Sequence, residues 1–187
     1  MNRNLYFNLI VALLISFSVS AQKNKVHFHS INSFGLIGGE TETGIAFQTI
    51  NGIRFSNWFS GIGVGIDNYE YKTLPLFFDA RWYFGSEKKA FVYGDLGYNF
   101  PMKNKPGKEM VYYDNYHFKG GLYSELGIGF KTKFIKKSSI FFSLAYSYKQ
   151  LESRVEEIVP LCSECDPIWY NYKLSYGRVM LKTGIEF

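Results

Sequence analysis

The last stretch of the chain, from Trp169 to the terminal Phe187, most constrains how this sequence can fold. Its apolar residues recur at every second position. One set is Val179, Leu181, Thr183, Ile185 and Phe187, and the opposite set is Arg178, Met180, Lys182, Gly184 and Glu186. A period of two indicates a β-strand, because successive side chains of a strand point to opposite faces. An apolar face backed by a charged face is typical of a transmembrane β-barrel strand, which meets lipid on one side and a polar lumen on the other.

The start of the chain has the pattern of an export signal. A short polar start containing Arg3 precedes the apolar run Leu9 to Ile15, and small residues follow up to Ala21. This run is much shorter than the ~20 residues that a membrane-spanning helix needs. We therefore predict a signal peptide over residues 1–21, cleaved after Ala21, and a single barrel domain over residues 22–187.

Seven further segments alternate like the last one, which makes eight candidate strands. They are residues 26–37, 43–55, 58–69, 73–84, 90–100, 117–131, 139–151 and 169–187. Each is at least as long as the ~9–11 residues that a tilted strand needs to cross the hydrocarbon layer. Aromatic residues make up 19% of the chain and prolines are few, as expected of strands. We predict an all-β fold, an eight-stranded antiparallel up-and-down transmembrane β-barrel.

The connections and the aromatic residues predict the orientation of this barrel. Residues 56–57, 85–89 and 132–138 are short turns, whereas residues 101–116 and 152–168 are long loops, which lie outside the cell in such barrels. Aromatic residues near the strand ends predict two interfacial girdles. One girdle has Trp58, Trp82, Phe84, Phe91, Phe130 and Phe187, and the other has Tyr69, Tyr71, Tyr98, Phe100, Phe118, Tyr148, Tyr170 and Tyr172.

Charged residues within the strands decide between two kinds of barrel. A soluble barrel of the lipocalin kind has an apolar interior and a polar exterior. Here six charged residues share faces opposite the most apolar rows, which favours a membrane barrel with a charged lumen. These residues are Asp79, Arg81, Asp95, Glu125, Arg178 and Lys182. Because eight strands enclose little more than their own side chains, we expect an internal ion-pair and hydrogen-bond network. A narrow ion path is the alternative.

Few residues suggest chemistry. Cys162 and Cys165 favour a loop-closing disulfide in an oxidising compartment, and free thiols, a metal site or a redox pair are alternatives. The histidines are His27, His29 and His117, and none has a serine and an acid placed for a catalytic triad. We expect no cofactor. The modest basic charge follows turns rather than one face, which disfavours nucleic-acid binding.

The final strand that ends in Phe187 resembles the C-terminal signature of Gram-negative outer-membrane barrels. The whole chain after residue 21 resembles the small eight-stranded members of that group, the OmpX-like proteins and the membrane domain of OmpA-like proteins. Two features depart from the group: only two connections are long, and we expect no peptidoglycan-binding module of the kind that OmpA-like proteins carry after the barrel.

The resemblance implies an integral outer-membrane location in the cell envelope, contact with lipid and lipopolysaccharide, and insertion by the barrel-assembly machinery, with Phe187 as the assembly signal. It is specific for fold rather than function. We expect a porin-like barrel without enzymatic activity, acting as a structural, adhesive or accessory subunit through its outer loops or its lipid-facing wall, with another outer-membrane protein as a possible partner. The alternatives are an outer-membrane lipid-modifying enzyme similar to a lipid A deacylase, and a narrow channel.

Overall fold

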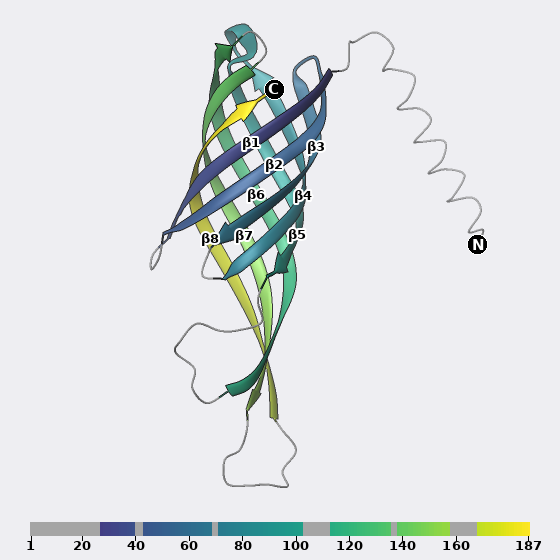
Figure 1. Ribbon diagram of the computed structural model, residues 1–187, viewed down its shortest axis with the longest axis vertical. Coiled ribbons are helices and arrows are strands. Elements are labelled where there is room, and N and C mark those ends of the chain that lie inside the picture. Colours follow the sequence, from purple (N-terminus) through teal and green to yellow (C-terminus); the bar gives the residue numbers. More distant parts are fainter. Residues whose placement is uncertain (1–26, 40–42, 69–70, 103–112, 136–137, 158–167) are drawn as a thin grey trace, which may run out of the picture.

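The computed structural model describes residues 27–39, 43–68, 71–102, 113–135, 138–157 and 168–187. The predicted signal peptide, Tyr69, Cys162 and Cys165 lie outside these residues. Eight antiparallel strands in sequence order form a closed barrel, as predicted (Figure 1). They are β1 (His27–Gly38), β2 (Gly44–Phe55), β3 (Trp58–Asn68), β4 (Lys72–Phe84), β5 (Ala90–Pro101), β6 (Tyr113–Ile135), β7 (Ser138–Glu157) and β8 (Ile168–Glu186). A 3-10 turn, η2 (Ser86–Lys88), connects β4 to β5.

The barrel closes between its first and last strands. β1 pairs with β8 from Ile31 opposite Glu186 to Gly38 opposite Val179. At the same end, the Phe187 amide donates to the Ser30 carbonyl at 2.9 Å. The backbone groups of the wall are thus paired around the whole ring, which is the condition for a sheet to cross a membrane.

The outward face of the wall is apolar. Large apolar side chains are exposed on every strand, among them Ile62 at 64%, Leu126 at 71% and Phe142 at 60%. Such a continuous apolar surface is unfavourable in water and suits the hydrocarbon layer of a membrane. Among the described residues, no helix is long and apolar enough to cross a membrane.

The lumen is filled by inward side chains, many of them aromatic. Buried residues in its cluster are Ile31, Ile37, Ala46, Ile50, Phe59, Phe77, Tyr83, Phe91, Tyr93, Tyr123, Phe141, Ala145 and Met180. Glycines on neighbouring strands make room for these rings. A Cβ atom added to Gly63 would lie 2.3 Å from the Phe77 ring, so this strand can carry no larger residue there without rearrangement.

Several of the expected girdle residues do not belong to an outward-facing girdle. Phe91 is only 1% exposed and belongs to the lumen, because Ala90 and Val92 take the outward positions of β5. Phe118 is 9% exposed and packs against Tyr71, with ring centroids 4.9 Å apart. Other girdle residues do face outward, namely Trp58, Trp82, Phe130 and Phe187 at one end and Tyr98 and Phe100 at the other.

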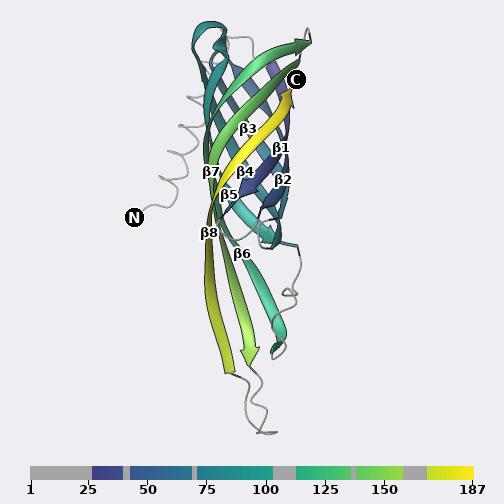
Figure 2. The same cartoon turned by 90° about the vertical axis from the view of Figure 1, so that its left-hand side faces the viewer.

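Three strands are longer than the rest and extend beyond the barrel. β6, β7 and β8 have 23, 20 and 19 residues, against 11 to 13 in the other five. They continue as a three-stranded sheet past the ends of β1 to β5, on the side of the expected outer loops (Figures 1 and 2). We call this sheet the outer extension; it comprises residues 113–120 of β6, 151–157 of β7 and 168–177 of β8.

The outer extension corrects the expected loop boundaries. Parts of the loops predicted at residues 101–116 and 152–168 are strand. At the opposite end of the barrel, all described residues of the turn predicted at 132–138 are strand as well. The alternation of apolar residues ends where the wall leaves the lipid, so the sequence pattern stops there. Backbone pairing between β6, β7 and β8 does not depend on that alternation and continues.

Candidate functional site

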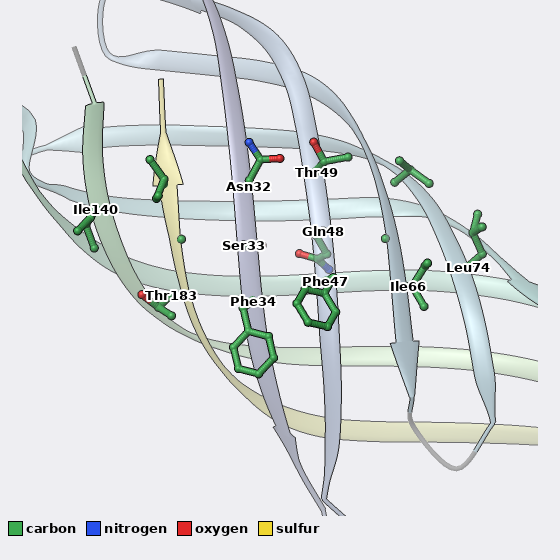
Figure 3. Close-up of a pocket in the computed structure, with 14 residues that line it drawn as sticks. Asn32, Ser33, Phe34, Phe47, Gln48, Thr49, Ile66, Leu74, Ile140 and Thr183 are labelled. Atoms are coloured by element: carbon green, nitrogen blue, oxygen red, sulfur yellow. The ribbon is translucent and has the colours of Figure 1, made fainter. Parts of the chain in front are cut away.

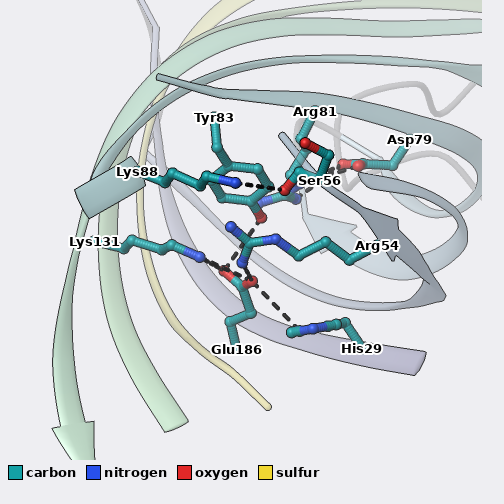
Figure 4. A network of polar contacts seen from close by, with 9 residues as sticks. All are labelled: His29, Arg54, Ser56, Asp79, Arg81, Tyr83, Lys88, Lys131 and Glu186. Atoms are coloured by element: carbon teal, nitrogen blue, oxygen red, sulfur yellow. Dashed lines mark hydrogen bonds and ion pairs between the residues drawn. The ribbon is translucent and has the colours of Figure 1, made fainter. Parts of the chain in front are cut away.

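The inner end of the lumen, where the chain's C-terminus lies, is organised around Glu186. Its carboxylate accepts hydrogen bonds from Lys131 Nζ at 3.0 Å, Arg54 Nη1 at 3.0 Å and the Tyr83 hydroxyl at 3.2 Å (Figure 4). His29 Nδ1 lies 3.5 Å from the same carboxylate. These five residues come from β8, β6, β2, β4 and β1. One buried carboxylate therefore ties together strands from all around the barrel.

A second network lies deeper in the lumen, around Glu125. Its carboxylate accepts from the Tyr93 hydroxyl at 2.7 Å and the Tyr123 hydroxyl at 2.8 Å, and it forms a close ion pair with Lys182. Lys182 Nζ also donates to the side-chain amide oxygen Oε1 of Gln48 at 2.7 Å. These contacts are charge-assisted hydrogen bonds, because the carboxylate of Glu125 and the ammonium of Lys182 carry charge. Every partner is buried, and in this low-dielectric setting each member depends strongly on the others.

Beside Glu125 stand two further acids in neighbouring strands. Asp79 pairs across β4 and β5 with Asp95, and Asp95 pairs across β5 and β6 with Glu125. Arg81 Nε donates to both oxygens of Asp79, at 3.0 and 2.9 Å. Asp95 is 3% exposed and accepts no hydrogen bond from the described residues. This level of the lumen thus has three carboxyl groups beside two basic residues, Arg81 and Lys182.

A third network closes the outer end of the lumen. Lys149 of β7 forms a close ion pair with Asp67 of β3 and donates to the Thr73 hydroxyl at 2.6 Å. All three side chains are almost completely buried. Just beyond them, Phe118 packs against Tyr71 and Leu174 over the mouth. Ion pairs and rings therefore occupy the lumen from one end to the other, in keeping with the small interior of an eight-stranded barrel.

The structure places all six predicted lumen charges on the inward face. Five of them are at most 4% exposed, and Arg178 is 9% exposed. It brings together two pairs, Asp79 with Arg81 and Glu125 with Lys182. Several partners were missed: Arg54, Lys131 and Glu186 at the inner end and Asp67, Lys149 and Thr73 at the outer end. Strand alternation puts them inward too, but it does not show which strands face each other across the lumen.

The histidine and serine that are neighbours in β1 are not brought together. His29 lies beside Glu186, while Ser30 occupies the opposite face of β1. The side chain of His117 lies outside the described part of the structure. No group of three or more His, Cys, Asp or Glu side chains in the described residues could hold a metal ion.

Two solved structures share this architecture. Outer membrane protein AlkL, solved by solid-state NMR in DMPC bilayers, matches with a TM-score of 0.53 and 12% sequence identity over 89% of this chain and 92% of AlkL. OprG from Pseudomonas aeruginosa matches with a TM-score of 0.50 and 11% identity over 86% of this chain and 95% of OprG. This chain has the fold of an outer-membrane β-barrel. No family model and none of the curated proteins compared matches its sequence.

The fold and the continuous apolar wall together make this outer-membrane barrel an integral membrane protein. Its wall carries a shallow groove of about 690 Å³ that runs from β7 and β8 across β1, β2 and β3 to β4 (Figure 3). Most of its surface is apolar, with Phe34, Phe47, Ile66 and Leu74 among the lining residues. The groove opens to the surroundings rather than to the lumen, so it is suited to a lipid acyl chain.

Proposed function

We propose that this outer-membrane barrel is a non-enzymatic surface-binding protein, an adhesive or accessory subunit whose working part is the outer extension. The observation that carries the proposal is the length of β6, β7 and β8 beyond the other strands. Crossing the membrane requires only ~9–11 residues per strand, so this additional sheet is not explained by spanning.

The outer extension offers a strand edge for binding. Residues 168–178 of β8 pair with β7 alone among the described strands, because pairing with β1 begins at Val179. The amide groups of successive residues in a strand point to opposite sides of that strand. The amide of Phe187 points toward β1. Asn171 lies an even number of residues before Phe187, so its amide points to the same side, which is open at this height. An exposed row of amides and carbonyls can add a strand from another protein by β-augmentation.

The filled lumen supports a binding role rather than a narrow channel, and the positions of the histidines argue against a lipid-modifying enzyme. A channel needs a continuous path, but the three polar networks and the ring cluster occupy the inward face along the barrel. An enzyme acting on lipid needs a nucleophile and a base near the outer leaflet. The described residues offer no such pair, since His29 is near the inner end.

The first experiment blocks the open edge. Asn171→Pro removes one edge amide without removing an amide that pairs with β7, and Asn171→Ala is the matched control because it keeps the amide. A second variant replaces residues 153–172 by Asn-Gly, which joins Glu152 directly to its cross-strand partner Lys173 in a two-residue hairpin turn. Each tagged protein is purified gently from its native outer membrane, and proteins bound in stoichiometric amount are identified.

We expect the wild type and Asn171→Ala to retain the same bound protein and the two other variants to lose it. All four proteins should still change mobility on a gel after boiling, which shows that the barrel is folded. Retention of the partner by the shortened variant would overturn the proposal. A lone wild-type barrel would also contradict it, and reproducible single-channel steps in planar bilayers would support the channel instead.

A further inference from the structure

The outer extension has a basic groove on the face that continues the lipid-facing wall. Register places Lys119 of β6, Glu152 of β7 and Lys173 of β8 in one row across the three strands. Arg154 of β7 stands in the next row on the same face, opposite Asn171. All five side chains are exposed. The strand pairing therefore gathers three basic residues from three strands into one patch.

The groove between these residues has the size and charge for an anionic group. Its volume is about 460 Å³, and its lining is mainly polar, consisting of Lys119, Glu152, Ser153, Arg154, Asn171, Tyr172 and Lys173. Glu152 is the one acid among these lining residues. Within the described residues, neither lysine has an ion pair, and the Arg154 guanidinium lies 4.5 Å above the Trp169 ring, a contact that leaves its charge unneutralised. The patch keeps a net positive charge.

The height of the groove matches the head-group layer of the membrane. Tyr148 of β7 belongs to the aromatic rim, and Glu152 follows it four residues further out on the same face of the strand. At about 3.3 Å per residue along a tilted strand, this places the groove roughly 10 Å beyond the rim. Because it faces sideways, away from the barrel axis, the groove meets the head groups of the surrounding outer leaflet.

We propose that this groove binds the phosphate groups of lipopolysaccharide in the outer leaflet. Lys119 and Lys173 supply point charges from the two flanking strands, and Arg154 supplies a planar fork of donors that suits phosphate oxygens. The amide of Asn171 adds a neutral donor. Bound lipid head groups hold the base of the outer extension at a fixed height above the membrane. This inference stands apart from the proposed function and requires no protein partner.

The test measures binding of lipopolysaccharide to the full-length barrel refolded in detergent that contains none. The probes are phosphorylated lipopolysaccharide, the same material after enzymatic dephosphorylation, and inorganic phosphate at equal phosphate concentration. The variant Lys119→Ala/Arg154→Ala/Lys173→Ala removes the groove's basic residues. The matched control Lys88→Ala/Lys89→Ala/Lys133→Ala removes three basic residues at the opposite end of the barrel. A gel shift after boiling checks that each protein is folded.

We expect the groove variant to bind phosphorylated lipopolysaccharide roughly 100-fold more weakly than the wild type, since each basic residue near an anionic surface strengthens binding about fivefold. The control variant should bind like the wild type, and dephosphorylation should weaken wild-type binding to a similar extent. Equal binding by the groove variant, or no effect of dephosphorylation, would overturn the proposal. Inorganic phosphate that binds as tightly as the lipid would assign the groove to free phosphate instead. If the triple variant does not fold, the single variant Lys173→Glu is tested in its place. Unchanged affinity of Lys173→Glu for phosphorylated lipopolysaccharide would equally refute the inference.

Discussion

At the scale of single residues, the lumen of this barrel depends on carboxylates that each serve several partners. Glu125 accepts from Tyr93 and Tyr123 and pairs with Lys182. Glu186 does the same for Lys131, Arg54 and Tyr83 at the inner end. Taking charges out of water is costly, so such a cluster is stable only while all its members are paired. Removal of one member should therefore cost more than the loss of a single hydrogen bond.

Neutralising Glu125 tests this dependence. Glu125→Gln removes the carboxylate that pairs directly with the buried ammonium of Lys182, and we expect it to lower the free energy of unfolding by about 3–5 kcal/mol. The exposed Glu152→Gln should change it by less than about 0.5 kcal/mol. Urea unfolding in detergent measures both. Equal effects of the two substitutions would contradict a cooperative network, and Glu125→Gln/Lys182→Met should recover much of the loss.

At the scale of elements, neighbouring strands pack closely because a large side chain of one strand lies over a glycine of the next. The inward face of β3 carries Gly61, Gly63 and Gly65, and the facing side chains of β2 and β4 occupy the space. Phe77 of β4 covers Gly63, and its ring packs 5.3 Å from that of Tyr123. The pairing of β3 with β4 is thus determined by side-chain volume as well as by backbone hydrogen bonds.

Enlarging Gly63 should loosen this pair of strands. A Cβ atom there lies 2.3 Å from the Phe77 ring, so we expect Gly63→Ala to destabilise the barrel by about 1–3 kcal/mol in urea unfolding. Gly94→Ala is the control, because its nearest neighbour would be 3.8 Å away and the wall has room for a methyl group. The second change Phe77→Leu should partly restore stability to Gly63→Ala. A Gly63→Ala barrel as stable as the control would show that Phe77 is free to move.

At the scale of the whole molecule, closure between β1 and β8 turns a sheet into a membrane-spanning barrel. These two strands lie at opposite ends of the sequence, yet Asn32 pairs with Ile185 at the middle of β1. Both side chains are outward, where the lumen network does not reach them. An open sheet would leave unpaired amides in hydrocarbon, which costs several kcal/mol for each group.

A disulfide across the closing pair tests closure and register together. In a variant with Cys162→Ser and Cys165→Ser, we expect Asn32→Cys/Ile185→Cys to oxidise readily, since directly paired strand residues lie within disulfide range. Once linked, the boiled chain should migrate faster than its reduced form on a gel. The control is Asn32→Cys/Leu181→Cys, in which Leu181 lies opposite Leu36 instead. Preferential oxidation of the control would mean a register shifted by four residues.

The sequence by itself determined the class of fold, the number of strands and the two faces of each strand. Alternation is a property of neighbouring residues, so it also predicted that Asp79, Arg81, Asp95, Glu125, Arg178 and Lys182 face the lumen. Nearness to the strand ends predicted Phe91 and Phe118 in the girdles, and both predictions are wrong. Phe91 follows the alternation of β5 and faces inward, whereas a register shift between Gly120 and Tyr123 reverses the faces of β6 and turns Phe118 inward.

Only the tertiary structure decided which side chains meet and how far the sheet continues. Glu186 contacts Lys131, and Lys149 contacts Asp67, across distances in sequence that no local pattern encodes. The outer extension likewise arises from pairing between β6, β7 and β8, where lipid no longer imposes an apolar face. Local alternation follows from the surroundings of each strand, whereas cross-lumen contacts and strand length follow from closure and register, which are properties of the complete barrel.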